Sequence, residues 1–225
     1  MANKKKKKPS AKPQQQISPK NYILTGRARK LPIVECWISP DWQEAGICSI
    51  VVARQHTTGN VTFGIYLVDT FCLGLKNTNA VFNKPDYEYT DICNNIFEQH
   101  EGKEKISYAL AHNIIYGAIA YAEDLGFKPE KDWVLSQMIL EEDTEDVELI
   151  DVEFGKNGKP FFMNGPYDNI QKVVATLDKS VGRGNYDTML RLDDPSKLSL
   201  QNYEFDTDDD DDDSAEDIDY EEVKS

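Results

Sequence analysis

Histidine and cysteine are scarce in this sequence, and the few copies do not fall in the common metal-binding patterns. The chain of 225 residues has three histidines and four cysteines. No two histidines lie three or four residues apart and no two cysteines form a C-x-x-C pair, so the sequence predicts no metal site and no cofactor. We expect the cysteines to be reduced and mostly buried, as in a cytosolic protein. These residues are His56, His100, His112, Cys36, Cys48, Cys72 and Cys93.

The sequence also lacks a long apolar run and an apolar leader. Its most apolar stretches are much shorter than the roughly 18–20 residues that span a bilayer. The basic N-terminus runs into proline and glutamine instead of an apolar segment. We therefore expect a soluble cytoplasmic protein without a transmembrane segment.

Each end of the chain has little or no charge of one sign. Residues 1–30 contain ten basic residues and no acidic one, whereas 204–225 contain thirteen acidic residues and one lysine. Like charges at this density repel one another, and few apolar residues are present to offset the entropy of ordering. We predict a basic disordered head over 1–30, a single α+β domain over 31–192 and an acidic disordered tail over 193–225.

The runs of like charge within these ends are the residues expected to bind partners. An aspartate run can imitate a nucleic-acid backbone and occupy a basic surface, including the head of the same chain. A lysine run can bind RNA or an anionic membrane. A role in solubility alone also accounts for both runs. The expected partner-binding residues are Lys4, Lys5, Lys6, Lys7, Lys8, Asp208, Asp209, Asp210, Asp211, Asp212 and Asp213.

The distribution of charge places any nucleic-acid contact in the head. The chain carries a formal charge of -15, to which the head contributes +10 and 204–225 contributes -12, leaving -13 for 31–203. Phosphate contacts need clustered lysine and arginine, which an acidic domain surface does not offer. We therefore expect a protein partner, and nucleic acid only through the head. The sequence does not indicate a small-molecule ligand.

The first half of the domain has the pattern of β-strands. Val34–Ile38 reads as a short strand, followed by two longer β-rich runs, Ile47–Gln55 and Val61–Leu73. The four-residue loop Thr57–Asn60 contains glycine and joins the two runs, which predicts a hairpin. Apolar residues do not alternate strictly with polar ones in these runs, so we expect both faces of the strands to be covered.

Helical spacing begins after Lys76. The strongest helix has apolar residues every four positions, and Gly126 and Pro129 are placed to end it. A short helix capped by Asp132 and a final helix ended by Gly182 complete the set. The expected helices are Tyr87–His100, Lys103–Leu125, Asp132–Leu140 and Asp168–Val181.

A second hairpin is predicted near the C-terminal end of the domain. Val147–Phe154 reads as a strand, the loop Gly155–Lys159 contains the Asn-Gly pair that favours positive φ, and Phe161–Met163 reads as the returning strand. The predicted fold is α+β, with a mainly antiparallel sheet from two hairpins and three or four helices packed on one face.

One combination of residues has the types needed for hydrolysis. Cys72 could act as a nucleophile with His112 as its base and Asp69 or Asp151 as the acid. Nothing in the spacing brings Cys72 and His112 together, so a buried cysteine and a satisfied histidine explain them as well. A small hydrolase with its site near Asp69, Cys72 and His112 is the alternative function.

Other candidate sites have simpler structural explanations. Gly182–Asn185 follows a helix and does not begin one, so it predicts a helix end and not a phosphate loop. Strand aromatics such as Trp37, Trp42, Tyr66 and Phe71 lack interleaved basic residues, which favours core packing over base stacking. The long helix carries a dense set of polar residues, which is either a functional site or the solvent-exposed face of the helix. This set is His112, Asn113, Tyr116, Tyr121 and Glu123.

Three phrases of the sequence, taken in order, resemble a bacterial family of cytoplasmic proteins. They are Val68–Lys76 (VDTFCLGLK), Tyr121–Pro129 (YAEDLGFKP) and Phe154–Pro160 (FGKNGKP). The similarity covers most of Leu31–Val181 and leaves out both charged ends. The resemblance implies a bacterial origin and a self-contained domain, and it brings no established activity or catalytic residues.

Taken together, these observations predict a non-enzymatic cytoplasmic binding or adaptor protein. Its folded domain is expected to recognise a protein partner, while the charged ends modulate association with protein or nucleic acid.

Overall fold

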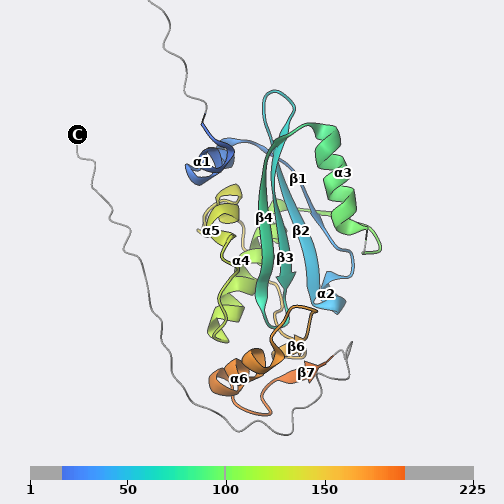
Figure 1. Cartoon of the computed structure of the whole chain (residues 1–225), viewed down its shortest axis with the longest axis vertical. Helices are drawn as coiled ribbons and strands as arrows, with labels where there is room; N and C mark the ends of the chain where they lie inside the picture. Colours follow the sequence, from blue (N-terminus) through green and yellow to red (C-terminus); the bar gives the residue numbers. More distant parts are fainter. Residues whose placement is uncertain (1–16, 99, 191–225) are drawn as a thin grey trace, which may run out of the picture. The chain divides into compact units, whose positions relative to one another are not determined.

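One antiparallel sheet organises the described part of the chain. The computed structural model describes residues 17–98 and 100–190. The main sheet has the strand order β4–β3–β2–β1–β5, and each neighbouring pair is antiparallel (Figure 1). The predicted α+β class is confirmed. The strands of this sheet are β1 (Ile33–Ile38), β2 (Ile47–Gln55), β3 (Val61–Asp69), β4 (Gly74–Lys84) and β5 (Glu104–Ile106).

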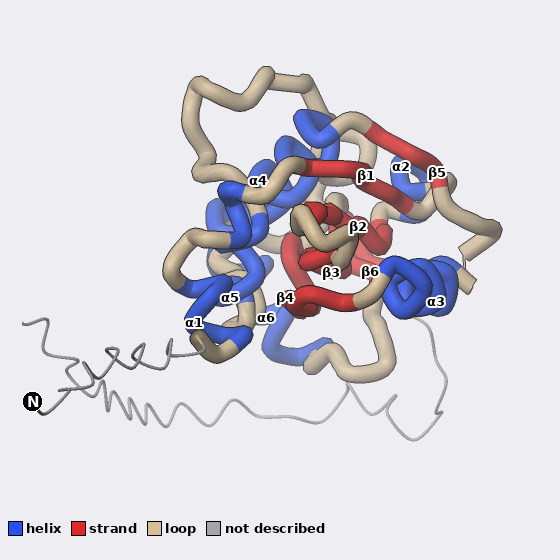
Figure 2. Tube along the Cα trace, turned by 90° about the horizontal axis from the view of Figure 1, so that it is seen from above, coloured by secondary structure: helices blue, strands red, loops and turns tan. Residues whose placement is uncertain are grey.

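Helices cover both faces of this sheet. Seen from above, the sheet lies between α3 on one side and α4 with α5 on the other (Figure 2). The prediction that all helices share one face is wrong, whereas the prediction that both faces are covered is confirmed. The helices are α1 (Pro19–Leu24), α2 (Trp42–Ala45), α3 (Asp86–Phe97), α4 (Tyr108–Asp124), α5 (Trp133–Ser136) and α6 (Ile170–Ser180), with 3₁₀ turns at Ala28–Lys30 and Gln137–Ile139.

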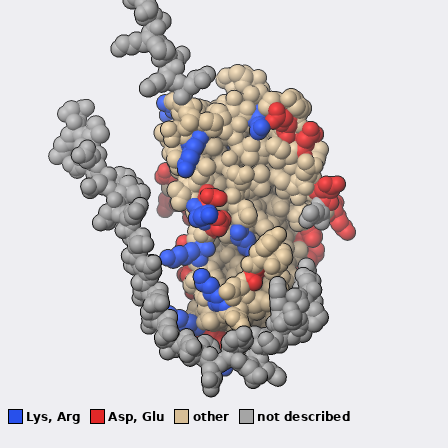
Figure 3. All heavy atoms as spheres, viewed as in Figure 1, with Lys and Arg blue, Asp and Glu red and all other residues tan. Residues whose placement is uncertain are grey.

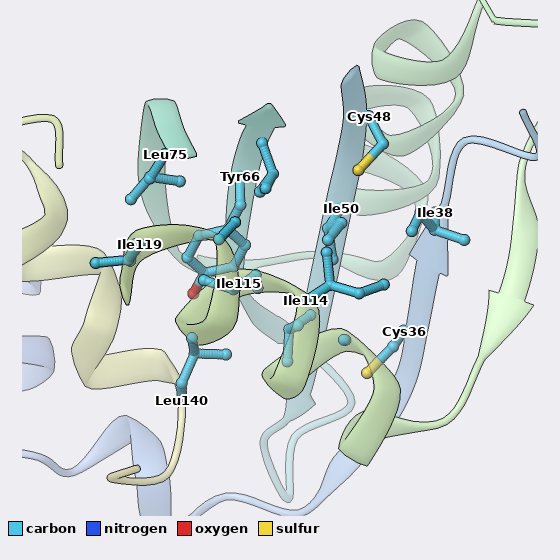
Figure 4. Packing of buried hydrophobic residues seen from close by; sticks show 14 residues of the cluster. Cys36, Ile38, Cys48, Ile50, Tyr66, Leu75, Ile114, Ile115, Ile119 and Leu140 are labelled. Carbon is cyan, nitrogen blue, oxygen red and sulfur yellow. The ribbon is translucent and has the colours of Figure 1, made fainter. Parts of the chain in front are cut away.

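The unbroken apolar pattern of β2 is the reason for the two covered faces. Ile50 and Val52 face α4, while Val51 and Ala53 face α3, and all four side chains are fully buried. Burying a side chain of this size contributes roughly 1.5–3 kcal/mol. Figure 4 shows isoleucines of α4, such as Ile114, facing the strands across this core.

The long helix begins later than its apolar spacing predicts. Lys103–Leu125 was expected to be helical throughout, but Glu104–Ile106 pairs with β1 as the edge strand β5. The Ser107 side chain then accepts a hydrogen bond from the Leu110 N–H (3.1 Å), which caps α4 at its true start. Spacing alone did not reveal this cap.

The predicted strand Val61–Leu73 is shorter in the structure, because its last four residues form a turn that leads to a further strand. β3 ends at Asp69, and β4 begins at Gly74, whose φ of +66° suits glycine. β4 continues to Lys84, so the expectation of helical structure after Lys76 is wrong. The backbone hydrogen bonds of β4 to β3 stabilise the strand, although its own sequence has only a weak strand pattern.

The second hairpin does not form. The Asn157-Gly158 turn is present with positive φ at both residues, as predicted, but its arms diverge. Lys156 and Lys159 pair across the turn, but beyond this bridge the Gly155 N–H donates to Thr70 O (3.0 Å) and the Phe161 N–H donates to Phe71 O (3.1 Å), so the arms continue against the β3–β4 turn. The returning strand β6 (Phe161–Met163) pairs in parallel with β7 (Asp187–Met189).

The remaining helices follow their sequence signals. α6 is capped by the Asn169 side chain, buries Val173 and Leu177, and ends before Gly182, as predicted. Asp132–Leu140 is helical as expected, although it divides into α5 and a 3₁₀ turn.

Ordered structure begins earlier than Leu31, inside the range expected to be a disordered head. The Ser18 side chain accepts a hydrogen bond from the Asn21 N–H (3.3 Å) and caps α1. Ile23 and Ala28 are buried against Ile139. These few apolar residues are enough to attach 17–30 to the domain despite its basic charge.

Two arginines connect this N-terminal segment to the chain after α5. The buried Arg54 guanidinium on β2 donates to the carbonyl oxygens of Arg29 (2.8 Å), Leu31 (2.7 Å) and Ile139 (2.6 Å), and it pairs with Glu141 (2.6 Å). Arg29 in turn donates to the carbonyl oxygens of Gln137 and Leu140 and pairs with Glu142.

We expect Arg54→Met to destabilise the protein by about 3 kcal/mol, because it leaves three carbonyl oxygens and one carboxylate without their donor. Urea unfolding of the full chain measures the change. Arg183→Met is the control, since its side chain is 83 % exposed and pairs only with Asp178, and it should cost less than about 1 kcal/mol. Equal losses in the two variants would contradict the role assigned to Arg54.

Candidate functional site

Asp69 and Cys72 lie together in the turn between β3 and β4. One carboxylate oxygen of Asp69 accepts hydrogen bonds from the N–H groups of Phe71 and Cys72, both at 2.9 Å. Burial raises the pKa of Asp69 to about 6, against the opposing effects of Lys76 and these backbone donors. Burial also raises the pKa of the Cys72 thiol, whose side chain is fully covered. The carboxylate therefore shapes the turn, and the thiol is held in its neutral form.

His112 lies on α4 and has no contact with Cys72 among those of the described residues. Its Nε2 is 3.3 Å from Glu141 O, and its ring lies between those of Tyr108 and Tyr116. Cys72 belongs to a different buried cluster, with Leu125, Phe162 and Leu177, and neither Cys72 nor His112 contributes to the pKa shift of the other. Burial lowers the pKa of the His112 imidazole. The structure thus brings Asp69 and Cys72 together but does not bring His112 to them.

The polar set on α4 holds the segment that follows the 3₁₀ turn. The Tyr116 hydroxyl donates to Glu141 O (3.2 Å), and the Asn113 amide donates to Glu148 O (2.9 Å). Tyr121 stacks on Phe154 at 5.9 Å between ring centroids. The part of this α4 face from His112 to Tyr121 is therefore covered by 141–154, whereas Glu123 is exposed.

Residues 148–154, here called the unpaired segment, have a strand pattern without a strand partner. Within the described residues, none of their backbone N–H groups donates a hydrogen bond, and only the Glu148 carbonyl accepts one. Alternate side chains point inward: Ile150 is half-buried, and Val152 and Phe154 pack on the core. Gly117 makes room for the Phe154 ring, because a Cβ there would lie 2.5 Å from it.

A groove of about 620 Å³ runs beside the unpaired segment. Its walls come from α2, the β3–β4 turn, the start of α4 and the unpaired segment itself. Three exposed carboxylates line it, and the only lysine in its lining, Lys156, lies over the rings of Phe71 (5.5 Å) and Phe161 (4.7 Å). We call it the acidic groove. Its main lining residues are Trp42, Glu44, Phe71, Leu110, Asp151 and Glu153.

A second groove, of about 550 Å³, lies between the C-terminal end of α4 and the start of α6. Lys76, Lys128 and Lys172 line it, and we call it the lysine groove. Lys76 is committed to an ion pair with Asp168 (2.5 Å) in which both side chains are about 15 % exposed. On the face drawn in Figure 3, lysines and arginines gather along the edge formed by α5, the end of α4 and α6.

The three phrases that carry the family resemblance meet at one place in the fold. Gly74 lies against α4, where a Cβ would be 2.6 Å from the Cβ of Ala122. Gly155 is bound to Thr70 O and lies against the Tyr121 hydroxyl. The phrases therefore build a packed junction between the sheet, α4 and the Asn157-Gly158 turn, and they do not assemble a catalytic set.

The other candidates from the sequence have structural roles. Tyr66 and Phe71 are buried, as core packing predicts, while Trp37 is half-buried beneath Lys103 (4.8 Å) and Lys105 (5.8 Å). In 17–98 and 100–190, no group of three or more His, Cys, Asp or Glu side chains is arranged to hold a metal ion. Gly182–Asn185 closes α6, as expected.

The expected partner-binding residues at the two ends, Lys4–Lys8 and Asp208–Asp213, lie outside the described residues. None of the helices in the described ranges combines the length and apolar character needed to cross a bilayer. In comparisons with known proteins, no family model, no curated protein and no solved structure matches this chain.

We predict that Asp69 makes stability depend on pH. The folded protein keeps this carboxyl protonated up to about pH 6, whereas the unfolded chain ionises it near its ordinary pKa of 3.8. Between these values the folded state binds more protons, so the free energy of unfolding falls as pH rises. Asp69→Asn retains the acceptor oxygen without ionising, and above pH 6 it should gain up to about 3 kcal/mol relative to wild type.

Urea unfolding from pH 4 to pH 7 measures this difference. Asp132→Asn, at an exposed position, is the control and should follow the wild-type profile. Parallel profiles for wild type and Asp69→Asn would show that the buried carboxyl does not titrate as its surroundings imply.

We also predict that Cys72 does not react in the native state. Its thiol is buried and un-ionised, so alkylation by iodoacetamide should proceed only as fast as the protein opens. Mass spectrometry of digested samples locates the label, and Ser180→Cys supplies an exposed thiol for comparison. Labelling of Cys72 as fast as that added thiol would revive the hydrolase hypothesis.

Proposed function

We propose that this chain is a non-enzymatic binding protein that recognises a protein partner by pairing with its unpaired segment. The observation that carries the proposal is a stretch of seven residues with strand alternation, held in place, whose backbone N–H groups have no partner among the described residues. Exposed strand edges of this kind accept a further strand from another chain.

The anchoring of the segment supports this role. Asn113 holds its first carbonyl, and Phe154 at its end packs into the space beside Gly117. A segment fixed at both ends loses little conformational freedom when a partner pairs with it, which favours binding. The adjacent acidic groove offers room for the partner's side chains, with a volume inside the range of about 300–1,000 Å³ found for ligand sites.

The charged ends are proposed to modulate this association. Basic and acidic runs change encounter rates and salt dependence more than the strength of a docked contact. Binding of nucleic acid through Lys4–Lys8 remains part of the proposal as a second property of the head. The four free, buried cysteines support the cytoplasmic location expected from the sequence.

The hydrolase alternative near Asp69, Cys72 and His112 has less support. It needs the thiol and the imidazole in contact, but among the described residues the His112 Nε2 lies against Glu141 O, and Cys72 belongs to the separate buried cluster around Leu125. The neutral, buried thiol also lacks the exposure of a nucleophile.

Proline substitutions in the full chain test the binding proposal. Successive N–H groups of a strand point to opposite edges, so Glu148→Pro and Asp151→Pro each remove a donor from a different edge. Glu148→Ala and Asp151→Ala are the matched controls, since they remove the same exposed side chains. In affinity purification from the protein's own cells, at least one proline variant should recover much less of the partner than the alanine variant at the same position.

Equal recovery of proteins by all four variants, including recovery of none, would contradict the proposal. The charged ends are tested in the same format by replacing Lys4–Lys8 with glutamine and Asp208–Asp213 with asparagine. We expect these two variants to keep the partner but to change the salt concentration at which it elutes.

A further inference from the structure

The alternation of the unpaired segment specifies the chemistry of its partner. Resting on the proposed function, we infer that the partner contributes an extended segment in which basic residues alternate with apolar ones. An added strand places its side chains in two rows, one on each face of the pair, beside the two rows of the segment it joins. The two rows of 148–154 differ sharply, so each imposes its own requirement.

The outward row of the segment consists of the exposed apolar residue Leu149 followed by Asp151 and Glu153, and the two carboxylates lack counterions among the described residues. Asp151 and Glu153 are exposed, and Glu44 stands across the groove from them. In the described part of the chain, none of the three forms an ion pair. Side chains of opposite charge directly across a strand pair stabilise it, whereas like charges oppose pairing. Lysine or arginine therefore belongs at alternate positions of the partner.

The inward row requires apolar side chains. On this side the segment directs Ile150, Val152 and Phe154 toward α4. The neighbouring groove wall is formed by Trp42, Leu110 and the edge of Phe71. A partner strand lying in the groove presents its second row of side chains to this wall, where valine, isoleucine or leucine removes apolar surface from water. The required pattern is thus basic and apolar residues in alternation.

The same charges exclude a second copy of this chain as the occupant. Antiparallel pairing of 148–154 with itself would set Asp151 and Glu153 of one copy beside the acidic row of the other. A nucleic acid is disfavoured for the same reason, because phosphates would meet these carboxylates. Lys156 is the one cation in the groove lining, and it lies over the rings of Phe71 and Phe161. We take its position as one end of the site.

The test uses a defined probe and the full chain. The probe is a blocked nine-residue peptide in which lysine alternates with valine, and its counterpart alternates glutamate with valine. All titrations use the variant in which Asp208–Asp213 are replaced by asparagine, so that the probe cannot be held by the acidic run. Calorimetry at low and moderate salt should show the lysine peptide binding at least about tenfold more tightly than the glutamate peptide.

Charge removal in the groove gives the second comparison. Asp151→Asn combined with Glu153→Gln should weaken binding of the lysine peptide by about tenfold. Glu123→Gln combined with Asp124→Asn removes the same charge from exposed positions at the end of α4 and should leave affinity unchanged. Equal affinities for the two peptides, or equal losses in the two double variants, would overturn the inferred partner chemistry.

Amide hydrogen exchange followed by NMR separates this inference from the proposed function. Strand addition should protect alternate amides of 148–154, because only every second N–H faces the new strand. Alternate protection by either peptide without charge preference would leave the proposed function standing and refute the basic partner. If a peptide binds but protects only amides outside 148–154, such as those around the lysine groove, both the inferred partner chemistry and the proposed strand pairing at 148–154 would be refuted.

Discussion

Arg54 places a guanidinium group inside an apolar domain, where it contacts backbone carbonyls from two distant parts of the chain. A buried cation is costly unless its donors are satisfied, and Arg54 meets this condition only when 28–31 and 139–141 lie against β2. The cost of leaving it unpaired therefore makes the two segments fold together with the sheet. The basic N-terminal stretch from Ile17 owes its place in the domain to this arrangement as much as to Ile23.

The same contact determines where the unpaired segment starts. Glu141, paired with Arg54, also donates its backbone N–H to the Tyr108 hydroxyl and accepts a hydrogen bond at its carbonyl from the Tyr116 hydroxyl. The chain then leaves this anchor, passes Asn113 on α4 and reaches Phe154, which packs beside Gly117. Because both anchors lie on α4, 148–154 runs extended along the helix and keeps its backbone edge free.

Local signals predicted most of the elements but not their pairing. The apolar run of β2 indicated two covered faces, and the apolar spacing before Gly182 indicated α6, because these signals depend on residues close in sequence. The edge strand β5 and the strand β4 were missed, since each is stabilised by a neighbouring strand instead of its own pattern. The separation of Cys72 from His112 likewise depends on tertiary packing, which spacing does not encode.

The wrong prediction at 147–154 carries the most information about function. Its alternation is that of a strand, and the Asn157-Gly158 turn after it is that of a hairpin, yet β6 pairs with β7 instead. In natural proteins the local sequence pattern agrees with the fold, and the exceptions lie mainly at functional sites. Folds also normally cover an open strand edge, because it can pair with other chains and cause aggregation. Here the fold fixes the strand at both ends and leaves its edge beside a groove. A segment with the pattern of a strand, anchored at both ends and without a neighbouring strand in 17–98 and 100–190, is the observation from which the proposed binding role follows.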